Sequence, residues 1–201
     1  MVKRLIRKIF SIKEEWKFAY LIKQGNLKVG VNCDLSKFSV SHNSLINGNC
    51  NIEIGDNCQI WGNIVLHDRH SKVKIGNRVF IGDNTMINCK DEIEIGDDVL
   101  ISWDCIIIDS NSHALDWENR TQDVIDWKEG PERKCWDHVI TKKVTISEKC
   151  WVGLRSIILK DVFLSPETIV AAGSVVTKNT QPKDIVGGNP ARIINRKDLS
   201  K

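Results

Sequence analysis

Aliphatic side chains recur at every sixth position between residues 146 and 177, and the fifth position of each six is small or β-branched. The first positions are Ile146, Val152, Ile158, Leu164, Val170 and Val176, and the fifth are Cys150, Ser156, Val162, Thr168 and Ser174. Neither an α-helix nor an amphipathic strand requires a period of six. The pattern predicts a stacked coil in which three sixes close a triangular turn, and successive turns pair as parallel strands about 4.8 Å apart.

The same period is visible earlier in the chain. Three coils start at Ile54, Ile75 and Ile95, and their other sides start at Ile60, Leu66, Ile81, Ile87, Ile101 and Ile107. Residues 27–51 have a ragged pattern that favours one or two imperfect first coils. Corner glycines at positions 55, 76, 82 and 96, with the Asn and Asp that follow, are typical of tight corners with a left-handed backbone. The coil domain is predicted to span residues 26–180.

The period breaks between Ile107 and Ile146, where a long polar segment intervenes. Loops of this length in compact repeat proteins are usually functional. The segment contains Trp117, Trp127 and Trp136, which disordered linkers rarely have. We therefore predict an extruded loop at 108–145 that leaves the prism, packs on itself or on a neighbour, and returns.

The first 25 residues differ from the rest. Apolar residues recur there at helical spacing, the other positions are rich in Lys and Arg, and Gly25-Asn26 is a plausible stop. This basic amphipathic helix could pack across the end of the coil stack or bind an anionic lipid surface, and the residues leave both readings open. Residues 181–201 are predicted to be a tail that carries the motif Gly-Asn-Pro-Ala-Arg, because Pro and paired Gly end the coils.

The composition fits one domain with a narrow, continuous core. The chain has 201 residues and a net charge of +3, which is too small to argue for a nucleic-acid partner. Its seven cysteines include no C-x-x-C pair. Cys58, Cys105 and Cys150 occupy small fifth positions, so we expect packing in a reducing cytosol rather than disulfides or metal. With no signal peptide evident, we expect a cytoplasmic protein, with peripheral attachment to the inner face of the membrane as an open alternative.

The repeat, a histidine where the long loop leaves the coils, and the Gly-Asn-Pro-Ala-Arg ending occur together. This combination resembles the hexapeptide-repeat acyltransferases, in particular the group of sugar O-acetyltransferases. The resemblance implies a mainly β fold, a left-handed parallel β-helix, against the usual right-handed rule for parallel crossovers. It also implies acetyl-CoA as co-substrate, no metal, and a homotrimer with the active site in the groove between neighbours.

His113 is the leading catalytic candidate and lies at the end of the run from Asp109. A neutral imidazole can take the proton of an attacking hydroxyl. From the residues alone, His113 could equally be a loop histidine that caps a turn. The resemblance implies that it is the general base. Its orienting partner is also open: the choices are a backbone carbonyl or one of Asp109, Asn111, Asp116 and Glu118.

The predicted ligand contacts fall in two groups. For the acceptor they are Asn84, by resemblance, together with Trp103 and Asp109; an ordinary corner Asn is the open alternative. For acetyl-CoA the resemblance implies Leu154, Ala172, Thr177 and Arg192, and Lys178 is added as a cation that could meet the phosphates. The physical argument is that small residues at 153 and 171–173 leave backbone amides open to a thin pantetheine arm, while the cations meet phosphates. These small residues could equally serve only to let coils stack.

The function predicted from the sequence is acetyl transfer from acetyl-CoA to a hydroxyl of a sugar or surface-polysaccharide precursor, directly and with His113 as base. The acceptor is thus a small molecule or glycan. One alternative is a zinc-dependent, carbonic-anhydrase-like β-helix protein, but that site needs three imidazoles, and His67 and His70 have the wrong spacing for it. A non-catalytic coil scaffold is the other alternative.

Overall fold

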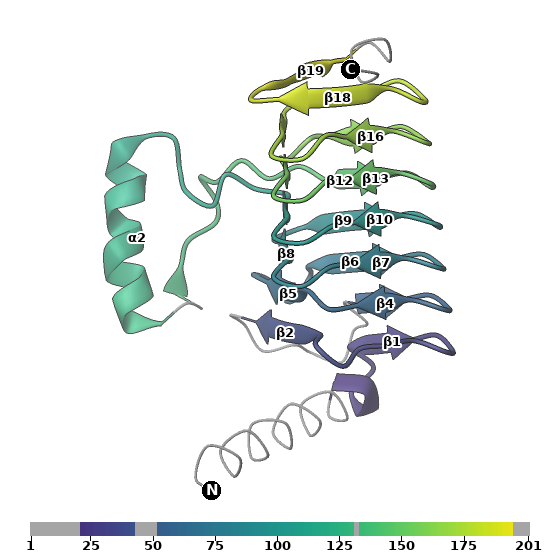
Figure 1. Ribbon diagram of the computed structural model, residues 1–201. Helices are drawn as coiled ribbons and strands as arrows, with labels where there is room; N and C mark the ends of the chain where they lie inside the picture. Colours follow the sequence, from purple (N-terminus) through teal and green to yellow (C-terminus); the bar gives the residue numbers. More distant parts are fainter. Residues whose placement is uncertain (1–20, 43–51, 131–132, 195–201) are drawn as a thin grey trace, which may run out of the picture.

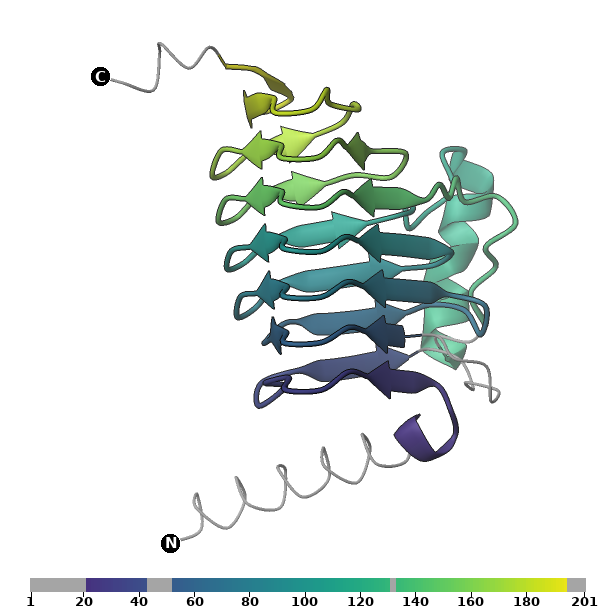
Figure 2. The same cartoon turned by 90° about the vertical axis from the view of Figure 1, so that its right-hand side faces the viewer.

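The protein forms a three-sided parallel β-solenoid of about seven turns, shown from two sides in Figures 1 and 2. The structure is a computed structural model that describes residues 21–42, 52–130 and 133–194. Strands of one turn pair with the equivalent strands of the next, as the period of six predicts. The predicted parallel β-helix is therefore confirmed.

Each side of the prism is one sheet. Sheet A contains β1 (Leu27–Val29), β3 (Ile52–Ile54), β6 (Lys72–Ile75), β9 (Glu92–Ile95), β12 (Val144–Ile146) and β15 (Phe163–Leu164). Sheet B contains β4 (Gln59–Ile60), β7 (Phe80–Ile81), β10 (Leu100–Ile101), β13 (Trp151–Val152), β16 (Ile169–Val170), β18 (Ile185–Gly188) and β19 (Ala191–Ile193). Sheet C contains β2 (Ser39–His42), β5 (Asn63–Leu66), β8 (Met86–Cys89), β11 (Ile106–Ile108), β14 (Ile157–Ile158) and β17 (Val175–Val176).

The aliphatic first positions fill the interior of the prism. Ile81, Ile101 and Val152 follow one another up sheet B, and none of them is exposed to solvent. Their strand neighbours, such as Leu100 and Trp151, point outward and are each half exposed. On these two-residue strands, one side chain points into the prism and the other points to solvent. An aliphatic residue is therefore required at the strand position that faces inward, which recurs once per side.

The cysteines at the fifth positions are packed against the neighbouring turn. The thiols of Cys58, Cys105 and Cys150 are buried and donate to the carbonyls of Gly76, Gly153 and Ser165 at 3.1, 3.3 and 3.2 Å. Burial raises the pKa of all three thiols, to about 11 for Cys150. The packing interpretation is confirmed, because a buried, protonated thiol is a poor nucleophile and a poor metal ligand.

The corner glycines are present for a different reason from the one predicted. Positive φ falls two residues later, at Asn57 (57°) and Arg78 (55°), and not at Gly55 or Gly76. A Cβ on Gly55 would lie 2.7 Å from the carbonyl oxygen of Gly76, and one on Gly76 would lie 2.3 Å from the carboxylate of Asp97. Glycine is thus required at these positions so that one turn can approach the next.

The amino-terminal prediction for residues 1–25 lies mostly outside the described residues. Residues 21–23 are helical, and Gly25 and Asn26 donate to the carbonyls of Ile22 and Leu21, which ends the helix at the predicted stop. Leu21 is 2% exposed and belongs to the core, so the end of the helix packs on the first coil. In the part of the chain that is described, no helix is both long enough and apolar enough to cross a membrane.

The carboxy-terminal end differs from the predicted tail at 181–201. β18 adds another parallel strand to sheet B beyond residue 180, and β19 then turns back and pairs with β18 in the antiparallel sense. The Gly-Asn-Pro-Ala-Arg motif forms the turn of this hairpin. The solenoid therefore ends in a β-hairpin that includes the motif.

Because burial alternates along β6, alanine substitutions at two neighbouring residues of this strand should change the free energy of unfolding by clearly different amounts. Replacing Ile75, which is 2% exposed, by Ala should lower the free energy of unfolding by about 2–5 kcal/mol, because it leaves a cavity between turns. The matched change Lys74→Ala, on the outward face, should stay within about 0.5 kcal/mol. Chemical denaturation at one fixed protein concentration measures both, and equal losses would contradict the assigned register.

Candidate active site

The long loop is closed at its base. It leaves after β11 and returns at β12, and the two limbs pair there through an antiparallel bridge between Ser110 and Thr141. The amide of Asn111 donates to the carbonyl of Ile140 at 3.0 Å, and the amide of Lys142 donates to that of Asp109 at 2.8 Å. The limb that carries His113 is therefore fixed to the prism.

The loop contains helix α2 (Trp117–Glu129), which stands beside the prism in Figure 1. Asp116 is its N-cap and accepts from the amide of Asn119 at 2.9 Å, and Gly130 ends it. Asp123 is the one buried residue of the helix, whereas Trp117 and Val124 are 63% and 75% exposed. A polar contact, and not an apolar face, thus anchors α2.

That polar contact is made with His113. Nδ1 of His113 lies within hydrogen-bond distance of Oδ2 of Asp123, and Nζ of Lys134 lies 2.6 Å from the same oxygen. The side chains of Asp123 and Lys134 are 8% and 2% exposed, while that of His113 is 49% exposed. A carboxylate at Nδ1 selects the tautomer that carries its proton there, so the lone pair of Nε2 is available to a ligand.

The carboxylate of Asp123 is held in its ionised form. Burial alone raises the pKa of Asp123, but hydrogen bonds and charge from Lys134 and His113 outweigh it and leave the pKa below its usual value. Asp123 is therefore an anion at neutral pH and can orient the imidazole as a hydrogen-bond acceptor.

A hollow of about 400 Å³ opens beside the imidazole and is lined by His113, Arg120, Asp123, Val124 and Trp127. The side chains of Val124 and Trp127 give it an apolar wall. Nη1 of Arg120 donates to the carbonyls of Ala114 and Leu115 at 3.0 and 2.8 Å, which fixes its guanidinium at the start of the helix. A ligand in this hollow would lie beside the indole of Trp127 and the imidazole of His113.

The partner of the imidazole is not among the residues predicted from the sequence. Asp116 caps α2, and Glu118 is exposed on its first turn. Asp109, predicted both as an orienting residue and as an acceptor contact, is fully buried, and its carboxylate accepts from the amides of Lys90 and Asp91 at 2.7–3.0 Å. Burial raises the pKa of Asp109. Asp109 is therefore out of reach of a ligand in solvent and does not contact His113, so both predictions for it were wrong.

Four of the predicted ligand residues form one column at the corners where the chain passes from sheet B to sheet C, here called the BC edge (residues 82–85, 102–105, 153–156 and 171–174). The column contains Asn84, Trp103, Leu154 and Ala172 on successive turns. The carbonyl of Trp103 accepts from the amide of Arg155, and that of Leu154 from the amide of Gly173. Asn84 has φ 59° and is an exposed corner residue.

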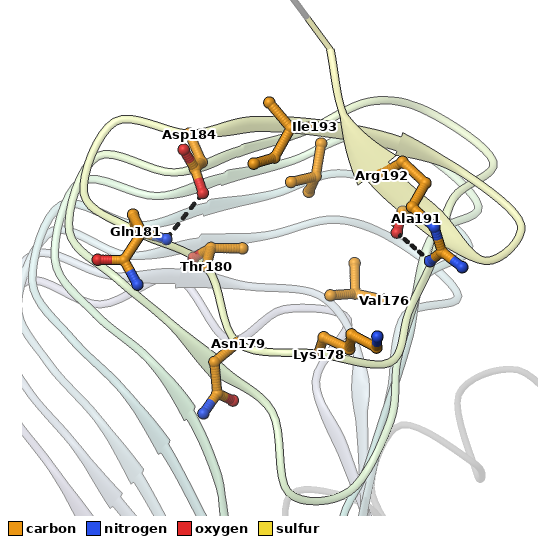
Figure 3. Close-up of a pocket in the computed structure, with 10 residues that line it drawn as sticks. Val176, Lys178, Asn179, Thr180, Gln181, Asp184, Ala191, Arg192 and Ile193 are labelled. Carbon is orange, nitrogen blue, oxygen red and sulfur yellow. Dashed lines mark hydrogen bonds between the residues drawn. The ribbon is translucent and has the colours of Figure 1, made fainter.

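His113, Thr177 and Lys178 lie instead at the CA edge, where the chain leaves sheet C (residues 109–143 and 177–178). Lys178 lines a hollow of about 440 Å³ at the carboxy-terminal end of the prism, together with Arg192 from β19. Figure 3 shows the two cations at one end of this hollow and Gln181 and Asp184 at the other. The structure thus places Lys178 and Arg192 at one hollow. Arg192 pairs with Gly187, which lies over Ala171, so Arg192 is close to the BC edge, whereas Lys178 is separated from Leu154 and Ala172 by the width of sheet C.

The amides predicted to be open to pantetheine are mostly occupied. Those of Gly153 and Ala171 donate to the next turn and that of Gly173 donates to the preceding turn, at 2.8 Å each. A Cβ on Gly153 would lie 2.7 Å from the amide nitrogen of Ala172, so this glycine serves the stacking of the coils. Ala172 itself is exposed, and a Cβ on Gly173 would meet no atom within 4 Å. The prediction of open amides was wrong for these three positions.

The histidines of the zinc alternative do not gather. Within the residues that the structure describes, no group of three His, Cys, Asp or Glu side chains could hold a metal ion. His67 contacts Asn88 and packs against the ring of Trp136, while His70 accepts from Arg69. The described residues therefore give no support to a zinc site.

The sequence analysis did not identify Asp123 and Lys134, which the structure adds to the candidate site. The helix that carries Asp123 has recognisable signals: the N-cap Asp116, an acidic first turn, a basic last turn and Gly130 at its end. Those signals predict the helix. They do not show which of its side chains contacts His113, because that depends on how the helix packs beside the prism.

Known proteins with a similar sequence carry acetyltransferase names. No protein-family model matches the chain. A Saccharomyces cerevisiae protein named as an acetyltransferase is 28% identical over 146 residues, which cover 73% of this chain and 56% of that protein. The galactoside O-acetyltransferase of Lactococcus lactis is 26% identical over 141 residues, covering 70% of this chain and 61% of that enzyme. The chain thus spans little more than half the length of these relatives.

Solved structures with a similar fold cover more of the chain. A variant of AntD, an N-acyltransferase from Bacillus cereus in complex with dTDP and coenzyme A, matches with a TM-score of 0.64 and 26% identity, covering 90% of this chain and 91% of that one. The polySia-specific acetyltransferase NeuO matches with a TM-score of 0.61 and 27% identity, covering 85% of this chain and 66% of that one. The resemblance to hexapeptide-repeat acetyltransferases is confirmed.

The buried position of Asp109 predicts a structural effect of its replacement. Asp109→Asn should lower the free energy of unfolding by about 1–3 kcal/mol. The Lys90 amide donates to both carboxylate oxygens, so in either orientation the NH2 group of Asn would face that N–H donor, from which it cannot accept. Asp91→Asn, at an exposed neighbouring carboxylate, is the matched control and should stay within about 0.5 kcal/mol. Denaturant unfolding measures both, and an unchanged Asp109→Asn variant would show that these hydrogen bonds are dispensable.

Proposed function

We propose that this chain, a hexapeptide-repeat protein in fold and sequence, is an acetyl-CoA-dependent O-acetyltransferase that acts on a hydroxyl of a sugar or surface-polysaccharide precursor. The observation that carries the proposal is the half-exposed His113, whose Nδ1 contacts the buried carboxylate of Asp123 and whose Nε2 is left for a ligand. This is the arrangement that a general base requires. The named relatives supply the reaction class.

In the proposed reaction, Nε2 of His113 takes the proton of the acceptor hydroxyl as the oxygen attacks the thioester carbonyl. The carbon–sulfur bond breaks, the acetyl group stays on the acceptor oxygen, and the imidazolium returns its proton to the thiolate of coenzyme A. Asp123 keeps the ring in one tautomer and stabilises the transient positive charge. No covalent intermediate with the chain is needed.

Two cations support a phosphate-bearing donor. Lys178 and Arg192 line the same hollow, are both exposed, and lie at its one end (Figure 3). Side chains of this kind bind phosphate through charge-assisted hydrogen bonds. Since AntD is a structural neighbour crystallised with coenzyme A, we infer that the acyl donor of this chain is acetyl-CoA, with Leu154, Ala172 and Thr177 as further contacts.

The positions of these residues call for a second copy of the chain. Leu154 and Ala172 lie at the BC edge, and His113 and Thr177 at the CA edge of the same molecule. One donor can contact both sets if the BC edge of one chain faces the CA edge of another. A head-to-tail contact of this kind closes into a ring, and a three-sided prism favours a homotrimer.

The hollow beside His113 suits a sugar acceptor. Its wall contains the ring of Trp127, which is 43% exposed, and the C–H face of a pyranose packs well on such a ring. Asn84 and Trp103 of the facing BC edge would complete the site in the trimer. The relatives include galactoside O-acetyltransferase and the polySia-specific NeuO, which supports a glycan hydroxyl as the acetylated group.

The role of His113 is tested by acetyl transfer. His113→Ala should lower kcat by roughly 10²–10⁴-fold, since a general base contributes about that much, while the affinity for coenzyme A stays unchanged. His138→Ala, at an exposed histidine of the same loop, is the matched control and should keep full activity. Thiol release from acetyl-CoA, followed over a panel of sugars with free hydroxyl or amino groups, measures the rate.

Two results would overturn the proposal. One is an active His113→Ala variant, and the other is the absence of thiol release with every acceptor although coenzyme A binds. Preference for an amino sugar over its hydroxyl counterpart would keep the acyl transfer and replace the O-acetyl product by an N-acetyl product.

If Lys178 and Arg192 bind the phosphates of the donor, removing either positive charge should weaken the binding of coenzyme A. Lys178→Ala and Arg192→Ala should each raise the Kd for coenzyme A about tenfold, because each removes a charge-assisted hydrogen bond worth about 1.5 kcal/mol. Neither change should affect the binding of pantetheine, which lacks the nucleotide phosphates. Lys183→Ala, at an exposed lysine outside the hollow, is the control, and calorimetry that shows equal Kd values for all variants would refute the phosphate assignment.

A further inference from the structure

Lys134 is a buried lysine that the proposed reaction does not use. Its side chain is 2% exposed, although it lies in the loop outside the prism. Nζ is 2.6 Å from Oδ2 of Asp123 and 5.2 Å from the ring centre of Trp136. Removing an ammonium from water is costly unless it gains a specific charge partner, so this position indicates a role for its charge.

The oxygen that Lys134 contacts is the same Oδ2 that contacts His113. A buried carboxylate beside an imidazole, with no other cation, stabilises the imidazolium form. An imidazolium cannot accept the proton of a hydroxyl. A second cation on the same oxygen offsets that attraction and still leaves the oxygen able to orient the ring.

We infer that Lys134 is a positioning residue for His113: its ammonium balances the charge of Asp123, so that the carboxylate orients the imidazole without holding it in the protonated form. The catalytic part of this inference rests on the proposed function. The electrostatic part concerns the free protein alone and can be measured without any substrate.

Other charged groups surround the network, and they supply a control. Arg120 faces His113 from α2, and across Trp136 lie His67 and Lys90, with Lys90 paired to Asp68 at 2.9 Å. Nζ of Lys90 is 5.5 Å from the centre of the same Trp136 ring. Burial lowers the pKa of His67, and the charges of Lys134 and Lys90 lower it further. Both lysines therefore act on His67, but Lys134 alone of the two contacts Asp123.

The test follows the imidazole C–H signals of the full-length protein by NMR as the pH is varied, with His113→Gln and His67→Gln used for assignment. Lys134→Met keeps the side-chain volume and removes the charge. It should raise the midpoint of the His113 titration by about one pH unit, because the carboxylate then acts on the imidazole alone. Lys134→Arg should leave that midpoint near the wild-type value.

Lys90→Met is the matched control. It removes a lysine that packs on the same Trp136 ring, so it should move the titration of His67 and leave that of His113 unchanged. The double variant Asp123→Asn with Lys134→Met removes both charges of the network and should bring the His113 midpoint back toward the wild-type value. This variant also keeps the test decisive if Lys134→Met alone fails to fold.

The kinetic readout is the pH profile of kcat/KM for acetyl transfer. For Lys134→Met, the acidic limb of this profile should move to higher pH by the same amount as the NMR midpoint. At a given pH on that limb, kcat/KM should then be about tenfold lower, while the plateau at alkaline pH stays unchanged. If Lys134 only held the loop in place, its loss would lower the alkaline plateau of kcat/KM and leave the acidic limb at the same pH.

An unchanged His113 midpoint in a folded Lys134→Met protein would overturn the inference, as would failure of Lys134→Arg to restore it. If the midpoint moves as expected and no acceptor is acetylated, the charge balance stands and the proposed function fails. The two failures are therefore distinguishable.

Discussion

The structure depends on the requirement that each turn of the chain lie directly on the next at hydrogen-bond distance. Corner amides donate to the neighbouring turn throughout, as at Trp103 with Arg155 and at Leu154 with Gly173. The requirement explains why a Cβ cannot be added at Gly55 and why the fifth positions are small. It also arranges ligand residues in columns, since equivalent corners are stacked one above the other.

The candidate active site follows a different principle, because its central element lies outside the stack. Helix α2 has one buried side chain, the carboxylate of Asp123, and its apolar residues are largely exposed. The contact among His113, Asp123 and Lys134 therefore both fixes the helix and orients the imidazole.

The sequence was sufficient for the fold because an inward-facing aliphatic side chain at the same place on every side leaves a fixed period of six, as Ile101 and Val152 show directly. It also marked His113 and the loop. The corner glycines were recognised for the wrong reason, because contact with the next turn cannot be seen from local conformation. Asp123 and Lys134 escaped notice for a related reason: no periodicity records how a helix that leaves the repeat settles against it.

The reversal of direction at β19 has a consequence for how molecules of this kind can meet. If the last strand of sheet B were parallel like the others, its unpaired N–H and C=O groups would match those of every inner strand. Another chain could then add a parallel strand to this edge of the sheet. Here Ala191–Ile193 runs against β18 and occupies that edge of sheet B. The outer edge of β18 is thereby paired within the chain itself, so a further strand cannot add to β18 in the parallel sense there.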